Sequence, residues 1–461
     1  MFSNELWQKS GVSTYSIDQS IRFNDDDSPI LKKTYSSAGT EETFTFSCWV
    51  KRGNIGAGLG GAGNYGITLF SGGSNTSNYG EIRFESSNGI GTQDSLFFYN
   101  VTGGSINMQL ATTQLFRDTS AWYHIVCVMD TTNDISTERM RIYVNGSRVT
   151  DFGTETYPSQ NTVPNFNTAT EHGVGGFAVG TDTRFFDGYL AEIVFIDGTA
   201  LDPSSFGEYN DSNIWIPKDV SGLTFGTNGF HIDGRDASGT PVKLGDDEAG
   251  SNNYTTSGMD ASDQKKDSPT NNHATWNPLT TSAQAYTNGN LNAASSSSAW
   301  KGGLATVQVP LNSGTWYYEV YIDSAGSSSG QFSVGWSESN RSLSDNNSSG
   351  DTEGWVTYAL NGNYYSNGGN GSYGATYTTG NVIGCKIDTN SSTNNVEFYK
   401  DGASQGTLSQ AFNTGGTGFI SPYILLYGTR NATARFAQAE WTQTPSGITE
   451  ANAINTSNLG S

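Results

Sequence analysis

Short runs in which apolar and polar residues alternate recur along most of the chain. In the first half the clearest are FTFSCWV at 44–50, WYHIV at 122–126 and RIYV at 141–144; in the second half they are TWYYEV at 315–320, FSVGW at 332–336 and VEFY at 396–399. A period of two is typical of strands that bury one face. Stretches rich in the residues that surface helices prefer are lacking, so the pattern predicts an all-β protein.

These strand-like runs form two groups with an apolar-poor stretch between them. We predict a docking segment at 1–14, a jelly-roll sandwich at 15–216, an irregular connector at 217–275, a second sandwich at 276–441 and a polar, loosely held tail at 442–461. Asn145-Gly146 and Asp401-Gly402 mark tight hairpins within the two sandwiches. The expected fold class is therefore all-β, with two tandem antiparallel β-sandwiches joined by an irregular connector.

Composition and charge narrow the classes of function. The chain has 461 residues, only 15% of them charged, and a net charge of −21. Because no Lys/Arg cluster larger than a pair occurs, we expect no nucleic-acid partner. No apolar run approaches 18 residues and the first 14 residues lack the pattern of an export signal, so neither a membrane span nor a signal peptide is expected. The three cysteines are interpreted as buried free thiols, although a Cys48–Cys127 bridge stays open.

The segment EIRFE at 81–85 carries the sharpest candidate for catalysis. Strand alternation puts Glu81, Arg83 and Glu85 on one face. Jelly-roll glucanases use two glutamates at this spacing, but with an aspartate between them. Here the arginine would neutralise both carboxylates and lower their pKa values, which is wrong for a general acid. His124 lies inside an apolar strand and no GxSxG motif occurs, so we predict a half-exposed, ion-paired strand and no enzyme.

Two pairs of aspartates flank predicted turns. Asp130 and Asp134 flank one turn, and Asp182 and Asp187 flank another just before the predicted closing strand. Carboxylates in loops, together with backbone carbonyls, are how proteins hold calcium. Aspartate also suits turns for purely local reasons. No motif requires a cofactor, and calcium is the one that these residues would suit.

Aromatic residues gather among Asn, Gly and Ser in the segment 354–377. The candidates for ligand contact are Trp355, Tyr358, Tyr364, Tyr365 and Tyr373. Rigid rings beside small polar residues are typical of recognition loops, and flat rings suit the C–H faces of sugars. The alternative is that half of these rings are core residues. The segment is therefore predicted to bind a ligand through whichever rings reach solvent.

Two family resemblances rest on longer motifs. The segments FTFSCWVKR (44–52), LFS (69–71), AWYHIV (121–126), RIYVNG (141–146) and DGYLAEI (187–193) resemble a laminin-G-like (concanavalin A-like) jelly roll. The segments GTWYYEV (314–320), VGW (334–336), NVIGCKID (381–388) and VEFYKDG (396–402) resemble a SPRY domain. The first resemblance implies glycan binding, with calcium at one rim of the sandwich. The second implies partner binding through loops, which would include 354–377.

The tandem order of these domains is similar to that of bacteriophage structural proteins. The DSPTN connector at 267–271 and the WNPL motif at 276–279 belong to this likeness. It implies a virion protein of the tail fibre or spike type that binds a host surface glycan or receptor, contacts other virion proteins through residues such as Leu6 and Trp7, and forms a homo-oligomer, most often a trimer. Two alternatives stay open: a purely structural capsid decoration or tail-linking protein, and a polysaccharide-degrading glycoside hydrolase.

Overall fold

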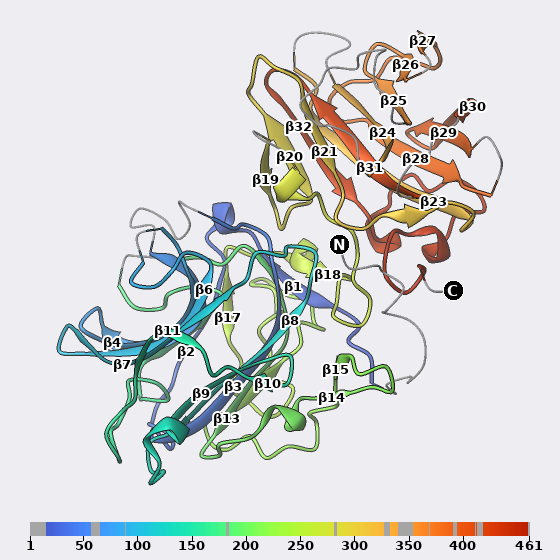
Figure 1. Ribbon diagram of the computed structural model, residues 1–461. Coiled ribbons are helices and arrows are strands. Elements are labelled where there is room, and N and C mark those ends of the chain that lie inside the picture. Colours follow the sequence, from blue (N-terminus) through green and yellow to red (C-terminus); the bar gives the residue numbers. More distant parts are fainter. Residues whose placement is uncertain are drawn as a thin grey trace. The chain divides into compact units, whose positions relative to one another are not determined.

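The structure is a computed structural model, and it describes most of the chain. The described residues are 15–56, 65–87, 89–180, 184–280, 284–326, 332–339, 354–367, 369–390, 394–410, 412 and 418–459. The predicted docking segment 1–14 lies outside them. The described residues form two compact units, one made by those up to Thr270 and the other by those from Asn271 onward (Figure 1).

The first unit is a sandwich of two antiparallel sheets. Sheet I has the strand order β10 (Ser147–Arg148), β9 (Met140–Val144), β8 (Tyr123–Asp130), β3 (Thr43–Arg52), β13 (Gly188–Asp197), β1 (Ser20–Phe23) and β18 (Gln264–Lys265), and β16 (Phe230–Ile232) also pairs with β13. Sheet II has the order β11 (Phe152–Thr156), β7 (Ser105–Leu115), β6 (Ser95–Thr102), β5 (Asn78–Glu85), β4 (Gly66–Asn75), β12 (Glu171–Val174), β2 (Ile30–Thr34) and β17 (Thr255–Ser257). The predicted jelly-roll architecture is thereby confirmed.

Alternation along β3 explains how the core of this sandwich forms. Phe44, Phe46 and Cys48 point between the two sheets and are fully buried there. Trp49 points to the outer face of sheet I, yet it is also buried, within a second cluster that includes Trp122. The hairpin of β14 (Gly207–Tyr209) and β15 (Trp215–Pro217) covers this outer face, because Trp215 packs beside that cluster. The central strands are therefore buried on both faces.

The segment 217–275 differs from the predicted irregular connector. Three short strands from it join the first sandwich, since β16 pairs with β13, β17 with β2 and β18 with β1. Phe230 and Tyr254 from this segment are part of the core. The sequence does not reveal this role, because strands of two or three residues are too short to show an alternating pattern.

The second unit is also a sandwich of two antiparallel sheets. Sheet III has the order β19 (Ala285–Thr287), β20 (Asn292–Ser295), β32 (Arg430–Arg435), β23 (Thr315–Ser324), β28 (Val382–Asp388), β29 (Asn394–Lys400) and β30 (Ala403–Gln410). Sheet IV has the order β21 (Lys301–Leu304), β31 (Phe419–Leu426), β24 (Phe332–Glu338), β25 (Trp355–Ala359), β26 (Asn363–Ser366) and β27 (Gly369–Ser372), and β22 (Val309–Pro310) pairs with β31. Trp316, Tyr318 and Trp336 lie in the core between them, as the sequence indicates.

Within the described residues, the helical structure is limited to single 3₁₀ turns. These are η2 (Asp25–Asp27), η4 (Ser136–Glu138), η5 (Pro203–Ser205), η6 (Ala261–Asp263), η7 (Pro278–Thr280), η8 (Gln438–Glu440) and η9 (Glu450–Asn452). A search of the described residues finds no helix long and apolar enough to cross a membrane. All three cysteines are buried free thiols, as interpreted from the sequence.

The described part of the predicted tail 442–461, residues 442–459, is not loosely held, contrary to the prediction. Ile454 is fully buried in the core of the second unit, and Ile448 packs with Tyr317, Tyr399 and Trp441 on the outer face of sheet III. The Ala274 N–H donates to the Ile454 carbonyl (2.9 Å), which ties the tail to the start of this unit. The tail is polar on average, and its few apolar residues are the ones that pack.

We expect Ile454→Ala to destabilise the second unit by about 2–4 kcal/mol, because it removes a buried side chain and leaves a cavity. The matched control is Ser457→Ala, since Ser457 is exposed three residues further along the same tail; its effect should stay within about 0.5 kcal/mol. Urea unfolding followed by tryptophan fluorescence measures both changes. Equal stability of the two variants would show that the tail is not part of the core.

Candidate functional site

Two of the predicted ligand-contacting aromatics are core residues instead. Trp355 and Tyr358 lie on β25 and are both buried. The Tyr358 ring packs against Tyr377 (5.0 Å between ring centroids) and Phe398 (5.6 Å). The prediction that they contact a ligand is therefore wrong. Their strand is covered on both faces, which its sequence does not reveal.

Tyr373 is half-buried, but its polar group is already used within the domain. Its hydroxyl donates to the Gly406 carbonyl and accepts from the Phe398 N–H (3.1 Å). Its ring stands edge-on to Tyr358 and Phe398. Tyr373 thus fixes its part of the predicted binding segment against the core.

Tyr364 and Tyr365 are the predicted residues that best keep access to solvent. They are adjacent on β26, so their side chains leave opposite faces of the strand, and both are half-buried. Gly371 on β27 lies opposite Tyr364, and Asn370 lies opposite Tyr365. A Cβ on Gly371 would lie 3.0 Å from the Tyr364 ring, so the ring lies directly over the glycine. We call β26 and β27 the tyrosine hairpin.

Amide side chains surround the tyrosine hairpin. The Asn361 side-chain amide donates to the Tyr365 hydroxyl (3.2 Å), and Asn370 is exposed on the neighbouring strand. Asn363 begins the same strand as the two tyrosines and is half-buried. The hairpin therefore combines partly accessible rings with short polar groups, which is the combination that sugar hydroxyls and C–H faces require.

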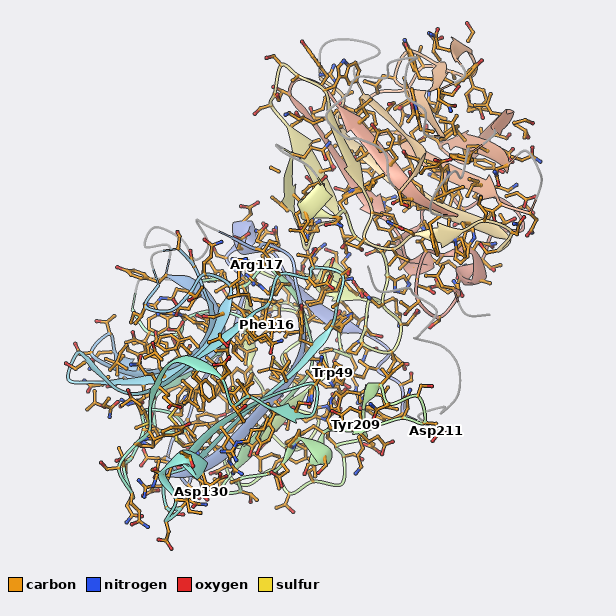
Figure 2. All side chains as sticks on the ribbon, in the orientation of Figure 1. Trp49, Phe116, Arg117, Asp130, Tyr209 and Asp211 are labelled. Atoms are coloured by element: carbon orange, nitrogen blue, oxygen red, sulfur yellow. The ribbon has the colours of Figure 1, made fainter. Side chains whose placement is uncertain are left out.

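The predicted calcium aspartates are not brought together. Asp130 ends β8 at the lower edge of the first sandwich in Figure 2, where its carboxylate accepts from the Thr132 hydroxyl (2.6 Å). The Asp134 carboxylate accepts from the Gln160 amide instead (2.8 Å). Asp182 lies outside the described residues, and Asp187 is fully buried. Among the residues that the structure describes, no group of three or more acidic, His or Cys side chains has the geometry of a metal site.

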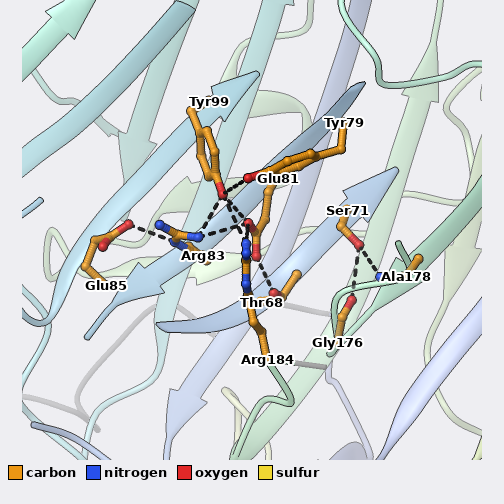
Figure 3. A network of polar contacts seen from close by, with 10 residues as sticks. All are labelled: Thr68, Ser71, Tyr79, Glu81, Arg83, Glu85, Tyr99, Gly176, Ala178 and Arg184. Atoms are coloured by element: carbon orange, nitrogen blue, oxygen red, sulfur yellow. Dashed lines mark hydrogen bonds and ion pairs between the residues drawn. The ribbon is translucent and has the colours of Figure 1, made fainter. Parts of the chain in front are cut away.

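The carboxylates of Glu81 and Glu85 are bound by arginine, as expected, but they are buried rather than half-exposed. The Arg83 guanidinium lies 3.1 Å from Glu81 and 2.7 Å from Glu85 (Figure 3). Burial acts to raise the pKa of Glu81, but Arg184 and Arg83 outweigh it and lower that pKa. Burial dominates at Glu85 and raises its pKa despite Arg83, so the expectation of a lowered pKa holds only for Glu81.

Residues distant in sequence complete this network and close it from solvent. Arg184, from the segment before β13, forms a second ion pair with Glu81, and the Tyr99 hydroxyl on β6 donates to the same carboxylate (Figure 3). The Arg184 guanidinium also stacks on the Phe177 ring. Ser71 holds this covering segment to β4, because its hydroxyl donates to the Gly176 carbonyl (3.1 Å) and accepts from the Ala178 N–H (3.0 Å).

A second buried charged pair links two strands of sheet I. His231 on β16 lies 2.9 Å from the Glu192 carboxylate on β13. Glu192 has a left-handed backbone (φ 47°) at an irregularity of the β3–β13 ladder, which turns its side chain to the outer face beside His231. Burial acts to lower the pKa of His231, but the hydrogen bond and charge of Glu192 outweigh it and raise the pKa. No pattern in the sequence indicates this pair.

Comparison with known families matches each sandwich separately. A family described as the concanavalin A-like lectin/glucanases superfamily matches residues 24–205, and the SPRY domain family matches residues 315–439. The chain thus carries a laminin-G-like (concanavalin A-like) domain followed by a SPRY domain, as the sequence motifs indicate. No curated protein matches the chain.

Solved structures with similar folds have low sequence identity. The SPRY domain of human HERC1 is 20% identical, with a TM-score of 0.28, over 35% of this chain and 96% of that one. Domains LG4-5 of the mouse laminin alpha1 chain are 10% identical, with a TM-score of 0.31, over 97% of this chain and 88% of that one. A heptameric SAP-like pentraxin from Limulus polyphemus is 16% identical, with a TM-score of 0.28, over 40% of this chain and 78% of that one.

Replacing Arg83 by Met should destabilise the first unit by about 3–5 kcal/mol, since it leaves buried carboxylates without their partner. The pKa values of Glu81 and Glu85 would then lie higher in the folded state, so the loss should be larger at about pH 7 than at about pH 4.5. Denaturant unfolding at the two pH values measures this.

The matched control for Arg83→Met is Arg117→Met. The Arg117 side chain is 51% exposed and Asp94 also has Arg52 as a partner, so the cost should stay below about 1 kcal/mol. A cost for Arg83→Met as small as that of the control, at both pH values, would contradict the role of the buried network.

The raised pKa of His231 predicts a loss of stability on the alkaline side. A histidine whose folded-state pKa is raised contributes its stabilisation fully below the unfolded value of 6.5, and this is lost as the pH rises through the folded-state pKa. Glu192→Gln should remove this dependence, so wild type and variant should differ more at about pH 6 than at about pH 9. Unfolding free energies across this range test the pair; a constant difference would show that the charge on His231 contributes nothing.

Proposed function

We propose that the protein is a binding protein of a bacteriophage virion, of the tail fibre or spike type, that recognises a host surface glycan through its SPRY domain. The observation that carries the glycan-binding part is the tyrosine hairpin, where Tyr364 and Tyr365 remain partly accessible beside Asn361 and Asn370. The tandem order of the two domains supports the virion part. As part of the same proposal, the protein attaches to other virion proteins and forms a homo-oligomer, with a trimer favoured.

Binding is favoured over hydrolysis by the state of the candidate catalytic carboxylates. Glu81 and Glu85 are both fully buried and both pair with Arg83, while Arg184 lies over Glu81. A glycosidase needs two carboxyl groups that flank an accessible sugar, with one of them free to donate a proton. A substrate would have to displace the covering segment and break these ion pairs before reaching either group.

The chemistry of the hairpin also limits the class of glycan. The chain carries 44 acidic and 23 basic residues, so its field repels polyanions at long range. The polar groups named at the hairpin are neutral amides, which suit hydroxyl groups and N-acetyl groups. A neutral or amino-sugar-containing polysaccharide therefore fits this surface better than a strongly acidic capsule.

Replacing Tyr364 and Tyr365 together by Ala should weaken binding to immobilised bacterial polysaccharides by about tenfold or more for each ring that stacks on sugar. The measurement is biolayer interferometry of the purified full chain against a panel of neutral, amino-sugar-containing and acidic polysaccharides.

Tyr321→Ala is the matched control for the tyrosine hairpin, because Tyr321 is a half-buried tyrosine on sheet III of the same domain. It should bind as wild type does. Saturable binding that only the hairpin variant loses would support the proposal. If wild type binds no polysaccharide of the panel, a purely structural role in the particle is favoured. If the hairpin variant binds equally well, glycan recognition by the tyrosine hairpin is excluded.

A further inference from the structure

A buried lysine of sheet I lies against the carboxylate of a residue far along the chain. Lys51, near the end of β3, and Asp267 are both buried, and the lysine Nζ lies 2.7 Å from the aspartate Oδ2. Strand alternation places Lys51 on the same outer face of β3 as Trp49. Asp267 follows β18 by two positions. The pair therefore joins a central strand of the sandwich to the end of the segment 217–275.

Asp267 is held in this position by several hydrogen bonds. Its main-chain carbonyl accepts from the Ser20 hydroxyl (2.6 Å). A few residues further along, the Thr270 hydroxyl accepts from the Ile17 N–H (3.0 Å) and donates to the Ile17 carbonyl (2.9 Å). The other carboxylate oxygen of Asp267, Oδ1, accepts from the indole N–H of the buried Trp122 (3.1 Å). Different groups thus bind the two carboxylate oxygens in a place nearly closed to solvent.

This pair differs from other ion pairs of the chain in combining burial with a lysine. The side chains of Lys51 and Asp267 are 1% and 7% exposed, whereas those of Lys386 and Glu397 are 29% and 19% exposed. The buried pair of Arg22 and Asp263 uses a guanidinium, which stays protonated and is no nucleophile. The Lys51 nitrogen becomes a nucleophile once it has lost one proton.

The surroundings of this pair favour a neutral product over two ions. Removing two charges from water carries a desolvation cost, which a neutral amide in the same place does not have. Amide formation between separate molecules in water is unfavourable, but groups fixed in contact react with effective molarities of about 10⁵–10⁸ M. Burial also keeps bulk water from reversing the reaction. Both the energetics and the placement therefore point to a reaction between the amine and the carboxyl.

We propose that Lys51 and Asp267 form an intramolecular isopeptide bond, an amide between the lysine Nζ and the aspartate Cγ, with loss of one water. A proton first passes from the ammonium to Oδ2 along their hydrogen bond, which leaves a neutral amine and a carboxylic acid. The amine lone pair then forms the N–C bond at Cγ, and the electron pair of the carbonyl moves to Oδ1. The Trp122 N–H already donates to that oxygen, so it stabilises the negative charge that develops there.

The release of water completes the bond. A second proton passes from the nitrogen to Oδ2, the Cγ–Oδ2 bond breaks as water leaves, and the carbonyl forms again on Oδ1. The nitrogen keeps one proton, so the amide and the water account for every atom of the ammonium and the carboxylate. The bond closes a loop between residues 216 positions apart and ties β3 to the chain just before Asn271, where the second unit begins. The first sandwich then cannot open by release of this segment from sheet I.

The test is the intact mass of the purified full chain under denaturing conditions. We expect a mass lower than that of the sequence by one water. Trypsin should fail to cleave after Lys51, and the digest should contain one branched peptide that joins Lys51 to Asp267. In the same digest Lys386 and Glu397 should stay unlinked, because their pair is open to solvent.

Lys51→Arg separates a covalent bond from an ion pair. Its guanidinium can still pair with Asp267 but offers no amine for the reaction. The variant should have the full sequence mass, and it should migrate more slowly than wild type in a denaturing gel because its loop is open.

Trp122→Phe tests the contribution of the indole N–H. It keeps an aromatic ring in the apolar cluster but removes the donor to Oδ1, so cross-linking should slow by about 10²-fold or more and the purified variant should be partly unlinked. Trp49→Phe, in the same cluster, is the matched control and should cross-link as wild type does. Complete cross-linking of Trp122→Phe at the wild-type rate would contradict the proposed step.

Wild type with the full sequence mass, cleaved by trypsin after Lys51, would overturn the proposal and leave these residues as an ion pair. This result does not depend on the folding of any variant. A lost water that maps to other residues would overturn it as well. None of these measurements involves polysaccharide, so failure of this proposal leaves glycan binding by the tyrosine hairpin standing.

Discussion

Burial of both faces of the central strands is the constraint on which the rest of this structure depends. A β-sandwich needs to bury only its inner faces, but here β3 carries Phe46 inward and Trp49 outward, and both are buried. An outer face with large apolar residues must be covered, because exposing it costs about 25 cal/mol for each Å². The β14–β15 hairpin does this in the first unit, and the tail with Ile448 does it in the second.

The same constraint explains where charge is found. When segments cover the outer face of sheet II, the side chains of that face lose water, and each charge must find a partner. Glu81 and Glu85 meet this condition through Arg83, and Arg184 arrives with the covering segment itself. A buried acidic residue therefore stabilises the fold only when a specific residue pairs with its charge.

The surfaces that can bind a ligand are therefore those that the covering segments leave accessible to solvent. In the SPRY domain, β25 is enclosed while the tyrosine hairpin at the edge of sheet IV keeps two partly accessible rings. Edge hairpins tolerate such rings because one side needs no packing partner. The sandwich provides a rigid support, and the hairpin provides the chemistry for a ligand.

The sequence by itself determined the all-β class, the two tandem sandwiches and most inward-facing core residues, because alternation such as that of Phe44, Phe46 and Cys48 is local. The sequence could not determine which side chains are exposed to solvent. Trp355 and Tyr358 have the composition of a recognition loop yet are core, and the segments at 217–275 and 442–461 look irregular yet pack. Only the tertiary structure decided these points, and only it joined Arg184 to Glu81 and His231 to Glu192. The physical reason is that burial and charge pairing depend on distant segments, whose approach no local pattern encodes.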